Sequence, residues 1–171
     1  MLISKELEAA INEQIGNEFG AHLQYVSVAA YFDADALPQL ADFFYRQAEE
    51  EKMHAMKFVH YIVDAGGQVR IPAIPAAKAD IGSAEDAVKL ALEWENEVTR
   101  QVNNLMSLAI QQNDYIGQSF LRWFVTEQLE EVSTMETLLQ TVRRAKDNLL
   151  WVEDYLARNP IVPTTPGTPA A

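Results

Sequence analysis

Cysteine is absent from this chain of 171 residues. Disulfides, thiolate zinc sites, iron–sulfur clusters and cysteine nucleophiles are therefore excluded. Long hydrophobic runs are absent too, since no stretch approaches the roughly eighteen apolar residues of a membrane-spanning helix. The N-terminal stretch MLISKELEAAINEQ also has no apolar segment of the kind found in signal peptides. These absences predict a cytoplasmic protein that does not contact a membrane.

Positive charge is scarce: 13 lysines and arginines stand against 25 acidic residues, for a net charge of −12. A nucleic-acid-binding protein needs a basic surface to neutralise phosphates, so we expect no nucleic-acid partner. Acidity suits either solubility or an affinity for cations, and charge alone does not choose between them. The length suits one domain with a sizeable core, and 49% hydrophobic residues is ordinary for a globular protein.

The sequence shows helical periodicity and no competing strand pattern. Capping and breaking residues predict four long helices and a shorter fifth: Ser4 to about Asp33, Pro38 to Ala65, Ser83 to about Gln112, Tyr115 to Ala145, and Asn148 to Ala157. Residues 66–83 hold two prolines and three glycines, which indicates an extended connection long enough to run the length of a bundle. The predicted fold class is all-α, a four-helix bundle with one long crossover and a short C-terminal helix. It occupies residues 1–158, and a Pro/Thr/Ala-rich tail at 159–171 is expected to be disordered.

Each long helix has an apolar stripe that carboxylates interrupt near mid-length. The interrupting residues are Glu18; Glu51, with His54 beside it; Glu95; and Glu127 and Glu131, with Gln128 adjacent. Burying an unpaired carboxylate costs on the order of several kcal/mol, and converging anions repel strongly at low dielectric. The stripes offer few inward lysines or arginines at this level. A multivalent metal is the natural counter-charge.

The spacing of these residues repeats between the two halves of the chain. Glu51 follows Glu18 by 33 residues, and Gln128 follows Glu95 by 33. An interval of 77 residues separates Glu18 from Glu95, Glu51 from Gln128, and His54 from Glu131. This is the arrangement that a pseudo-twofold bundle around two metals requires. A lone Glu-x-x-His such as Glu51 to His54 is usually a surface pair, and the repeated set is what favours metal binding.

Four segments in this order and spacing resemble bacterial non-haem ferritins, and most closely the actinobacterial ones. They are NEQIGNEFGAHLQY, AEEEKMHAM, ALEWENEVT and FLRWFVTEQLEE, and the similarity covers roughly residues 4–157. Inward glutamates combined with Glu-x-x-His motifs are the pattern of the ferritin-like di-iron proteins.

The resemblance implies a set of iron ligands. One iron would be held by Glu18, Glu51 and His54, and a second by Glu51 as a bridge, Glu95 and Glu131, with Gln128 nearby. A third, weaker iron would be held by Glu50, Glu127 and Glu130, and Tyr25 would adjoin the centre. On the residues alone, Tyr25 could equally be a core residue with a hydrogen-bonded hydroxyl. Glu50 and Glu130 could likewise be solvated charges on a helix face.

The chain departs from related families at three points. Gln128-x-x-Glu131 replaces the second Glu-x-x-His of bacterioferritins. Lys52 occupies the position of their haem-binding methionine, so no haem is expected. Ser119 and Arg122 stand where animal ferritins have the acidic residues of the threefold pore, which leaves the iron entry route open.

The resemblance implies iron storage with ferroxidase activity in a homo-oligomeric cage of twenty-four subunits. Hard carboxylate ligands favour Fe(III) over Fe(II), so O2 or H2O2 can take electrons from a bound Fe(II) pair. Weak ligation by an amide such as Gln128 would ease release of the second iron. The first alternative is a di-iron peroxidase or oxygenase with an organic substrate. The second is a non-enzymatic protein, either a DNA-protecting mini-ferritin, which the acidity disfavours, or an inert bundle.

Overall fold

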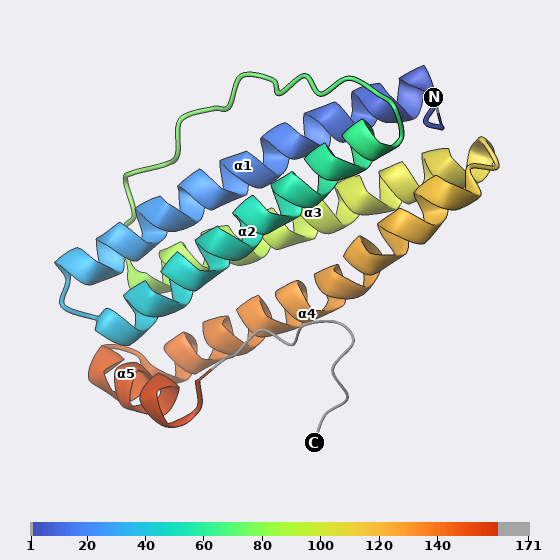
Figure 1. The fold of residues 1–171 in the computed structure, drawn as a ribbon. Helices are drawn as coiled ribbons and strands as arrows, with labels where there is room; N and C mark the ends of the chain where they lie inside the picture. The colour runs from blue at the N-terminus through green and yellow to red at the C-terminus, as the bar shows by residue number, and fades with distance from the viewer. Residues whose placement is uncertain (1, 161–171) are drawn as a thin grey trace.

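A computed structural model describes residues 2–160, and within them the chain forms five helices and no strand (Figure 1). The helices are α1 (Lys5–Ala34), α2 (Pro38–Asp64), α3 (Ala84–Gln111), α4 (Tyr115–Ala145) and α5 (Leu149–Arg158). The all-α fold with four long helices and a short C-terminal one is confirmed, and every predicted helix end agrees to within one residue. Residues 161–171, most of the predicted tail, lie outside the described residues.

The helix ends follow from local chemistry. Ser4 Oγ accepts a hydrogen bond from Leu7 N at 3.0 Å and begins α1. Ser83 Oγ does the same for Asp86 N at 3.1 Å and begins α3. At the end of α2, Gly66 has φ 74°, a left-handed conformation that glycine adopts without steric cost. These caps satisfy backbone groups that a helix end leaves unpaired, which is why the boundaries were predictable.

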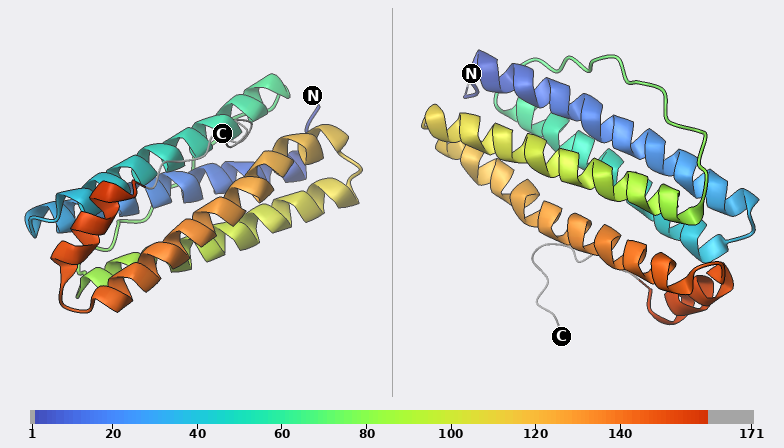
Figure 2. Two further views of the ribbon diagram at one scale, coloured as in Figure 1. Left: turned by 90° about the horizontal axis from the view of Figure 1, so that it is seen from below. Right: turned by 180° about the vertical axis from the view of Figure 1, so that it is seen from behind.

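The connection from α2 to α3 runs along the outside of α1 for most of the bundle (Figures 1 and 2). Two amide side chains of α1 hold it in place. Asn12 donates from Nδ2 to Gln68 O at 3.0 Å, and its Oδ1 accepts from Arg70 N at 2.5 Å. Gln24 donates from Nε2 to Lys78 O at 3.1 Å and accepts from Lys78 N at 2.8 Å. Each amide side chain thus pairs with backbone N–H and C=O groups of the connection, which has no helix or sheet to supply hydrogen-bond partners.

Helix α5 packs against α2 and α4 at the end of the bundle where α2 begins (Figure 2). The N-cap residue of α2, Leu37, has no side chain that can cap the helix. Glu153 of α5 supplies the missing acceptor, because its carboxylate oxygens accept from Gln39 N at 2.7 Å and Leu40 N at 2.9 Å. A carboxylate at a helix N-terminus is also favoured by the helix dipole. The last helix therefore caps the second one across more than a hundred residues.

Replacing Glu153 by alanine should destabilise the fold by about 1–2 kcal/mol, the usual cost of losing an N-cap. The freed amide of Leu40 is buried and that of Gln39 is partly buried, so water replaces the lost acceptor poorly. Urea denaturation followed by circular dichroism measures the change. Asp154→Ala is the matched control, since Asp154 is exposed on α5 and its ion pair within residues 2–160 is with the exposed Arg158. Equal midpoints for the two variants would contradict the capping role.

The hydrophobic core is divided into two parts along the bundle. One part, near α5, includes Phe32, Phe44 and Leu138, and the other, near the N-terminus, includes Ile11, Phe58 and Leu121. Between them lies a layer of buried polar side chains from all four long helices. No helix within residues 2–160 is long and apolar enough to cross a bilayer.

Candidate metal centre

The polar layer brings acidic side chains of all four long helices together at mid-length. Glu18 of α1 and Glu95 of α3 are 0% exposed, and Glu51 of α2 is 1% exposed. His54 of α2 and Glu131 of α4 are also buried. Helical spacing explains the convergence: each of these side chains lies on the stripe that its helix turns toward the bundle axis.

The described residues form three groups whose ligand atoms lie within 4.8 Å of one another. The groups are Glu18, Glu51 and His54; Glu51, Glu95 and Glu131; and His54, Glu127 and Glu131. Any two of the groups share one residue: Glu51 links the first to the second, His54 the first to the third, and Glu131 the second to the third. The arrangement is a closed triangle of three ligand sets, which could hold up to three neighbouring cations.

The layer is poorly satisfied by hydrogen bonds within the protein. Among the described residues, nine buried side-chain atoms lack a hydrogen-bond partner, and five of them belong to these groups. The five are Glu18 Oε2, Glu51 Oε1 and Oε2, His54 Nε2 and Glu127 Oε2. Buried polar atoms are normally paired, so such a concentration of unpaired ones calls for a specific explanation. Unpaired atoms gathered in such ligand groups are what bound cations would satisfy.

Burial and mutual repulsion make these carboxyl groups weak acids. Burial raises the pKa of Glu18 to about 7, against the opposing effect of the hydrogen bond from Gln14. Burial, reinforced by the charge of Glu95, raises the pKa of Glu51 and of Glu131 well above the usual range. Burial also raises the pKa of Glu95. Without a cation, the layer therefore retains protons near neutral pH, and a cation would displace them.

His54 is suited to be a ligand because burial keeps its ring neutral. Burial lowers the pKa of His54 to about 4, and the positive charge of Lys57 adds to this. Its Nδ1 lies 3.5 Å from Glu51 Oε2, and its Nε2 lies 3.9 Å from Glu127 Oε1. Trp123 and Phe124 enclose the ring edge-on, with centroids at 5.4 and 5.9 Å. A neutral imidazole in a fixed orientation offers a lone pair to a metal.

On the α3 side, two neutral groups hold Glu95. The Tyr25 hydroxyl donates a hydrogen bond to Glu95 Oε1, and Gln128 Nε2 donates to Glu95 Oε2 at 3.2 Å. Burial and the charge of Glu95 raise the pKa of Tyr25 well above its usual value, so Tyr25 stays protonated. Gln128 thus directs its amide nitrogen toward Glu95.

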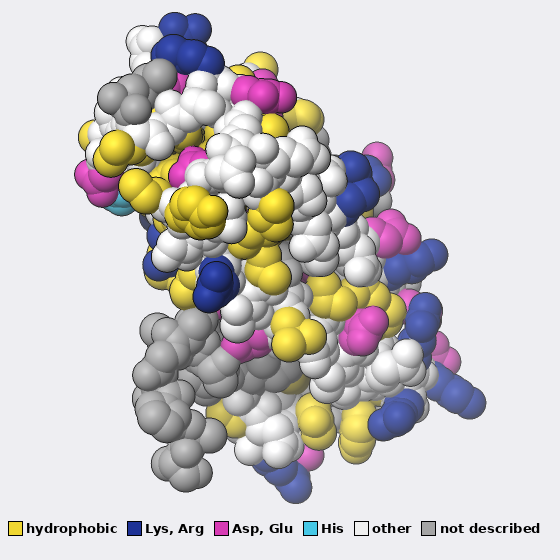
Figure 3. Space-filling model, turned by 90° about the vertical axis from the view of Figure 1, so that its right-hand side faces the viewer, with side chains coloured by type: hydrophobic (Ala, Val, Ile, Leu, Met, Phe, Trp, Pro, Cys, Tyr) yellow, Lys and Arg dark blue, Asp and Glu magenta, His cyan; other side chains and the backbone are white. Residues whose placement is uncertain are grey.

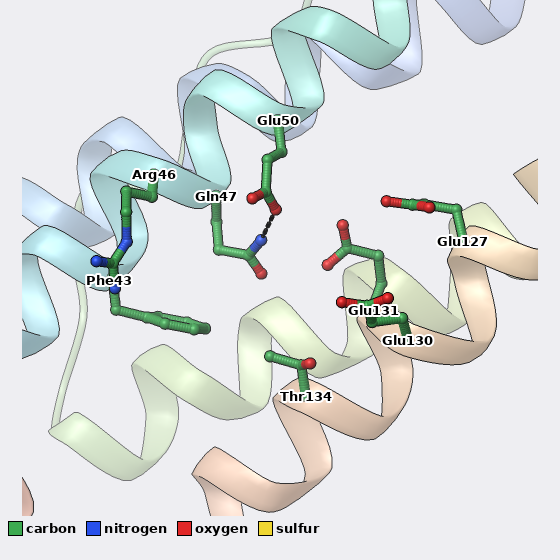
Figure 4. Close-up of a pocket in the computed structure, with 8 residues that line it drawn as sticks. All are labelled: Phe43, Arg46, Gln47, Glu50, Glu127, Glu130, Glu131 and Thr134. Carbon is green, nitrogen blue, oxygen red and sulfur yellow. Dashed lines mark hydrogen bonds between the residues drawn. The ribbon is translucent and has the colours of Figure 1, made fainter. Parts of the chain in front are cut away.

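A small cavity opens beside the third group, between α2 and α4. Glu50, Glu127, Glu130 and Glu131 line it together with Gln47 and Arg46, and Figure 4 shows the carboxylates of both helices directed into the same space. Glu50 accepts a hydrogen bond from Gln47, and burial raises the pKa of Glu50 and of Glu127 to about 7. Glu50 and Glu130 are partly buried and belong to none of the three groups. They lie at the cavity wall, while Glu127 faces His54.

Two polar residues of this layer were missed in the sequence. Gln14 is 2% exposed and donates from Nε2 to Glu18 Oε1 at 2.9 Å. Thr99 donates to Glu95 O at 2.8 Å and accepts from Gln128 Nε2 at 3.1 Å. Each lies four residues from a central glutamate, Gln14 before Glu18 and Thr99 after Glu95, so a search for polar neighbours one helical turn away could have found both.

Lys52 lies on the outside of α2, apart from the polar layer. Its side chain is 52% exposed and its Nζ pairs with Glu49 at 3.0 Å, on the solvent side of the helix. His22 contacts Ala48 O through Nδ1 at 2.7 Å. His60 is exposed. Of the three histidines in the sequence, His54 alone lies in the three groups.

Several carboxylates with one imidazole form an oxygen-rich donor set. Such a set suits iron, manganese or another hard to borderline cation, and it stabilises the higher charge of an oxidised metal. Glu51, one of the three shared residues, has two unpaired oxygens and could contact a metal on each side. The geometry therefore allows a pair of metals close enough to act on one small molecule.

The chain is similar to known proteins over most of its length. The sequence profile of the ferritin-like domain matches residues 8–145. The chain is 42% identical over 156 residues to the ferritin BfrB of Mycolicibacterium smegmatis, covering 91% of this chain and 86% of that protein. It is 40% identical over 147 residues to the bacterial non-heme ferritin of Staphylococcus aureus, covering 86% and 89%. Among solved structures, an open pore ferritin from Archaeoglobus fulgidus superposes with a TM-score of 0.88 at 30% identity, covering 91% of this chain and 97% of that one.

Proposed function

This chain belongs to the ferritin-like family of iron-storage proteins, and from that premise we propose that it oxidises Fe(II) at a centre within each subunit. The product, ferric oxyhydroxide, is stored inside a hollow homo-oligomeric cage. The observation that carries the proposal is the closed triangle of buried ligand sets with its unpaired lone pairs. Iron is the substrate and cargo, and O2 or H2O2 is the oxidant.

In this proposal two irons bind side by side. Glu18, Glu51 and His54 hold the first, and Glu51, Glu95 and Glu131 hold the second, with Gln128 and Tyr25 beside it. Glu51 bridges the two, which keeps both within reach of one oxidant molecule. Carboxylate ligation lowers the reduction potential of the pair and so favours loss of electrons to the oxidant. Tyr25 and Gln128 hold Glu95 in place by hydrogen bonds.

The cavity beside the centre is the proposed exit for oxidised iron. Glu127 adjoins the centre, while Glu50 and Glu130 lie further along the cavity wall. Acidic side chains at successive positions along the cavity keep negative charge close to a departing cation at each step. This supports a third, weaker iron position held by Glu127 with help from Glu50 and Glu130.

The surface supports self-assembly. At the end of the bundle where α3 connects to α4, hydrophobic side chains are exposed at the surface between charged ones (Figure 3). Leu2, Tyr115 and Ile116 line one hollow there and are 64%, 75% and 51% exposed. Clustered exposed apolar side chains mark surfaces that contact other molecules. We propose that they pack against further copies of the chain in a cage of twenty-four subunits.

Aerobic loading of the purified protein tests the proposal. Fe(II) added at about two irons per subunit should be oxidised in a fast burst, as a two-metal centre predicts. Repeated additions should give a large particle that holds far more iron than its binding sites, measured by light scattering and iron analysis. A burst without iron accumulation would instead favour a di-iron peroxidase or oxygenase. The absence of both would refute the proposal.

A further inference from the structure

His54 faces two different ligand sets with its two ring nitrogens. Nδ1 lies 3.5 Å from Glu51 Oε2, on the side of Glu18, and Nε2 lies 3.9 Å from Glu127 Oε1, on the side of the cavity. Two ligands that share one metal, each roughly 2 Å from it, lie at most about 4 Å apart. Both pairs meet this limit. The ring therefore stands between two positions, and either nitrogen could bind a metal.

A neutral imidazole cannot serve both positions at once. One ring nitrogen carries a proton and the other has the lone pair, so a metal on one side leaves an N–H on the other. With a metal on Nδ1, the Nε2–H points at Glu127, and a carboxylate acceptor is the usual partner of a metal-bound histidine. With a metal on Nε2, the proton moves to Nδ1 and points at Glu51. The number of protons on the ring is the same in both states.

We propose that His54 is a two-way ligand that couples the centre to the cavity. Its binding to a metal at Glu127 and Glu131 through Nε2 removes it from the metal at Glu18 and Glu51. Binding of a metal at the third position thus weakens metal binding at the first. A metal that arrives at Glu127 and Glu131 therefore promotes departure of the metal held by Glu18 and Glu51. This rests on the proposed function and deepens it, because it assigns a cause to turnover of the centre.

The neighbouring residues support a switch without a large movement. Trp123 and Phe124 contact the ring edge-on and hold it between α2 and α4. Glu131 belongs both to the group with Glu95 and to the group with Glu127, so the third position forms beside a ligand that is already present. The exchange needs a change of tautomer at His54 and a shift in the carboxylates, while the helices stay in place.

Zinc exchange tests the coupling without redox chemistry. The protein is loaded with about two equivalents of radioactive Zn(II) per subunit, and the label is chased with increasing unlabelled Zn(II). In the wild type, the label should leave about tenfold faster or more at high chase concentration, the scale of losing one supporting ligand. The variant Glu127→Gln keeps the size of the side chain and an acceptor oxygen but is a weak metal ligand. In this variant, the rate at which the label leaves should not depend on the concentration of unlabelled Zn(II). Glu49→Gln, which makes the same chemical change on the exposed face of α2 and outside the cavity, should keep the acceleration.

Crystals of the wild type at low and high zinc give a direct check that does not depend on any variant folding. At low zinc a metal should lie at Nδ1 of His54, and at high zinc a metal should lie at Nε2. Bonding through Nδ1 at both concentrations, with the third zinc on carboxylates alone, would overturn the proposal. A chase-independent rate in the wild type would do the same. Neither result would contradict the proposed ferroxidase function. That function would be contradicted by the absence of a fast burst of Fe(II) oxidation.

Discussion

Fe(II) oxidation in the Glu51→Ala variant should lose its fast burst, with an initial rate at least about 100-fold below the wild type. The expectation follows from the position of Glu51, which belongs to two of the three ligand groups and has both carboxylate oxygens unpaired. Its removal takes a ligand from both irons of the proposed pair at once, and losing even a supporting partner of a metal ligand costs about 10–100-fold. Stopped-flow absorbance at the ferric band measures the burst.

Glu49→Ala is the matched control for this experiment. Glu49 lies two residues away on the same helix, but its side chain is 67% exposed and pairs with Lys52. The control should oxidise Fe(II) at the wild-type rate. Glu51→Gln, which preserves the side-chain volume, separates loss of the ligand from loss of packing and should resemble Glu51→Ala. A wild-type burst in either Glu51 variant would show that the centre is assigned to the wrong residues.

The metal-free protein should become less stable as the pH rises from about 5 to 8. The pKa of Glu18 is about 7 in the folded state against 4.5 for the free side chain, so the folded state binds its proton more tightly. Its favourable contribution is complete below pH 4.5 and is lost as the pH rises through 7. This shift alone corresponds to roughly 3 kcal/mol. Glu51 and Glu131, whose pKa values are also raised well above the usual range, contribute to the loss with the same sign.

The contribution of His54 to stability changes with pH in the opposite direction, and this limits the pH range in which the effect of the carboxyl groups can be measured alone. Its pKa falls from 6.5 to about 4 on folding, so its contribution is present above pH 6.5 and is lost as the pH falls toward 4. Above pH 6.5, therefore, the raised carboxyl groups dominate the trend. Thermal unfolding of the metal-free protein between pH 6.5 and 8.5 should show a falling midpoint. A flat or rising midpoint in this range would contradict the raised pKa values.

The variant Glu18→Gln should bind metal more weakly than the wild type and be more stable in the metal-free state. At pH 8 it removes a buried charge while its oxygen can still accept from Gln14, so the metal-free variant should be up to about 3 kcal/mol more stable than the wild type. Zn(II) should raise the midpoint of the wild type more than that of the variant, which has lost one carboxylate of the first ligand group and keeps the other two groups. Glu13→Gln, at an exposed acidic position on the same helix, should change neither quantity by more than about 0.5 kcal/mol.

Much of this molecule was predictable because the relevant interactions are local. Ser4, Ser83 and Gly66 act within one turn of their own helix, so they mark helix ends without knowledge of the fold. The helical period alone assigns Glu18, Glu51 and Glu95 to the inward faces, since a residue's direction depends only on its position along the helix. The 33- and 77-residue intervals then predict that these side chains meet at one level.

Other features depend on residues far apart in the chain, and only the tertiary structure decided them. The sequence contains no sign that Glu153 caps α2, because that contact requires α5 to fold back across the end of the bundle. It also does not show that His54 turns one nitrogen toward Glu51 and the other toward Glu127, since ring orientation depends on the packing of Trp123 and Phe124. The amino-acid sequence by itself determined the helices and the inward placement of their carboxylates. How those carboxylates share neighbours was decided by the packing of four helices, because distances between side chains depend on how helix surfaces interlock.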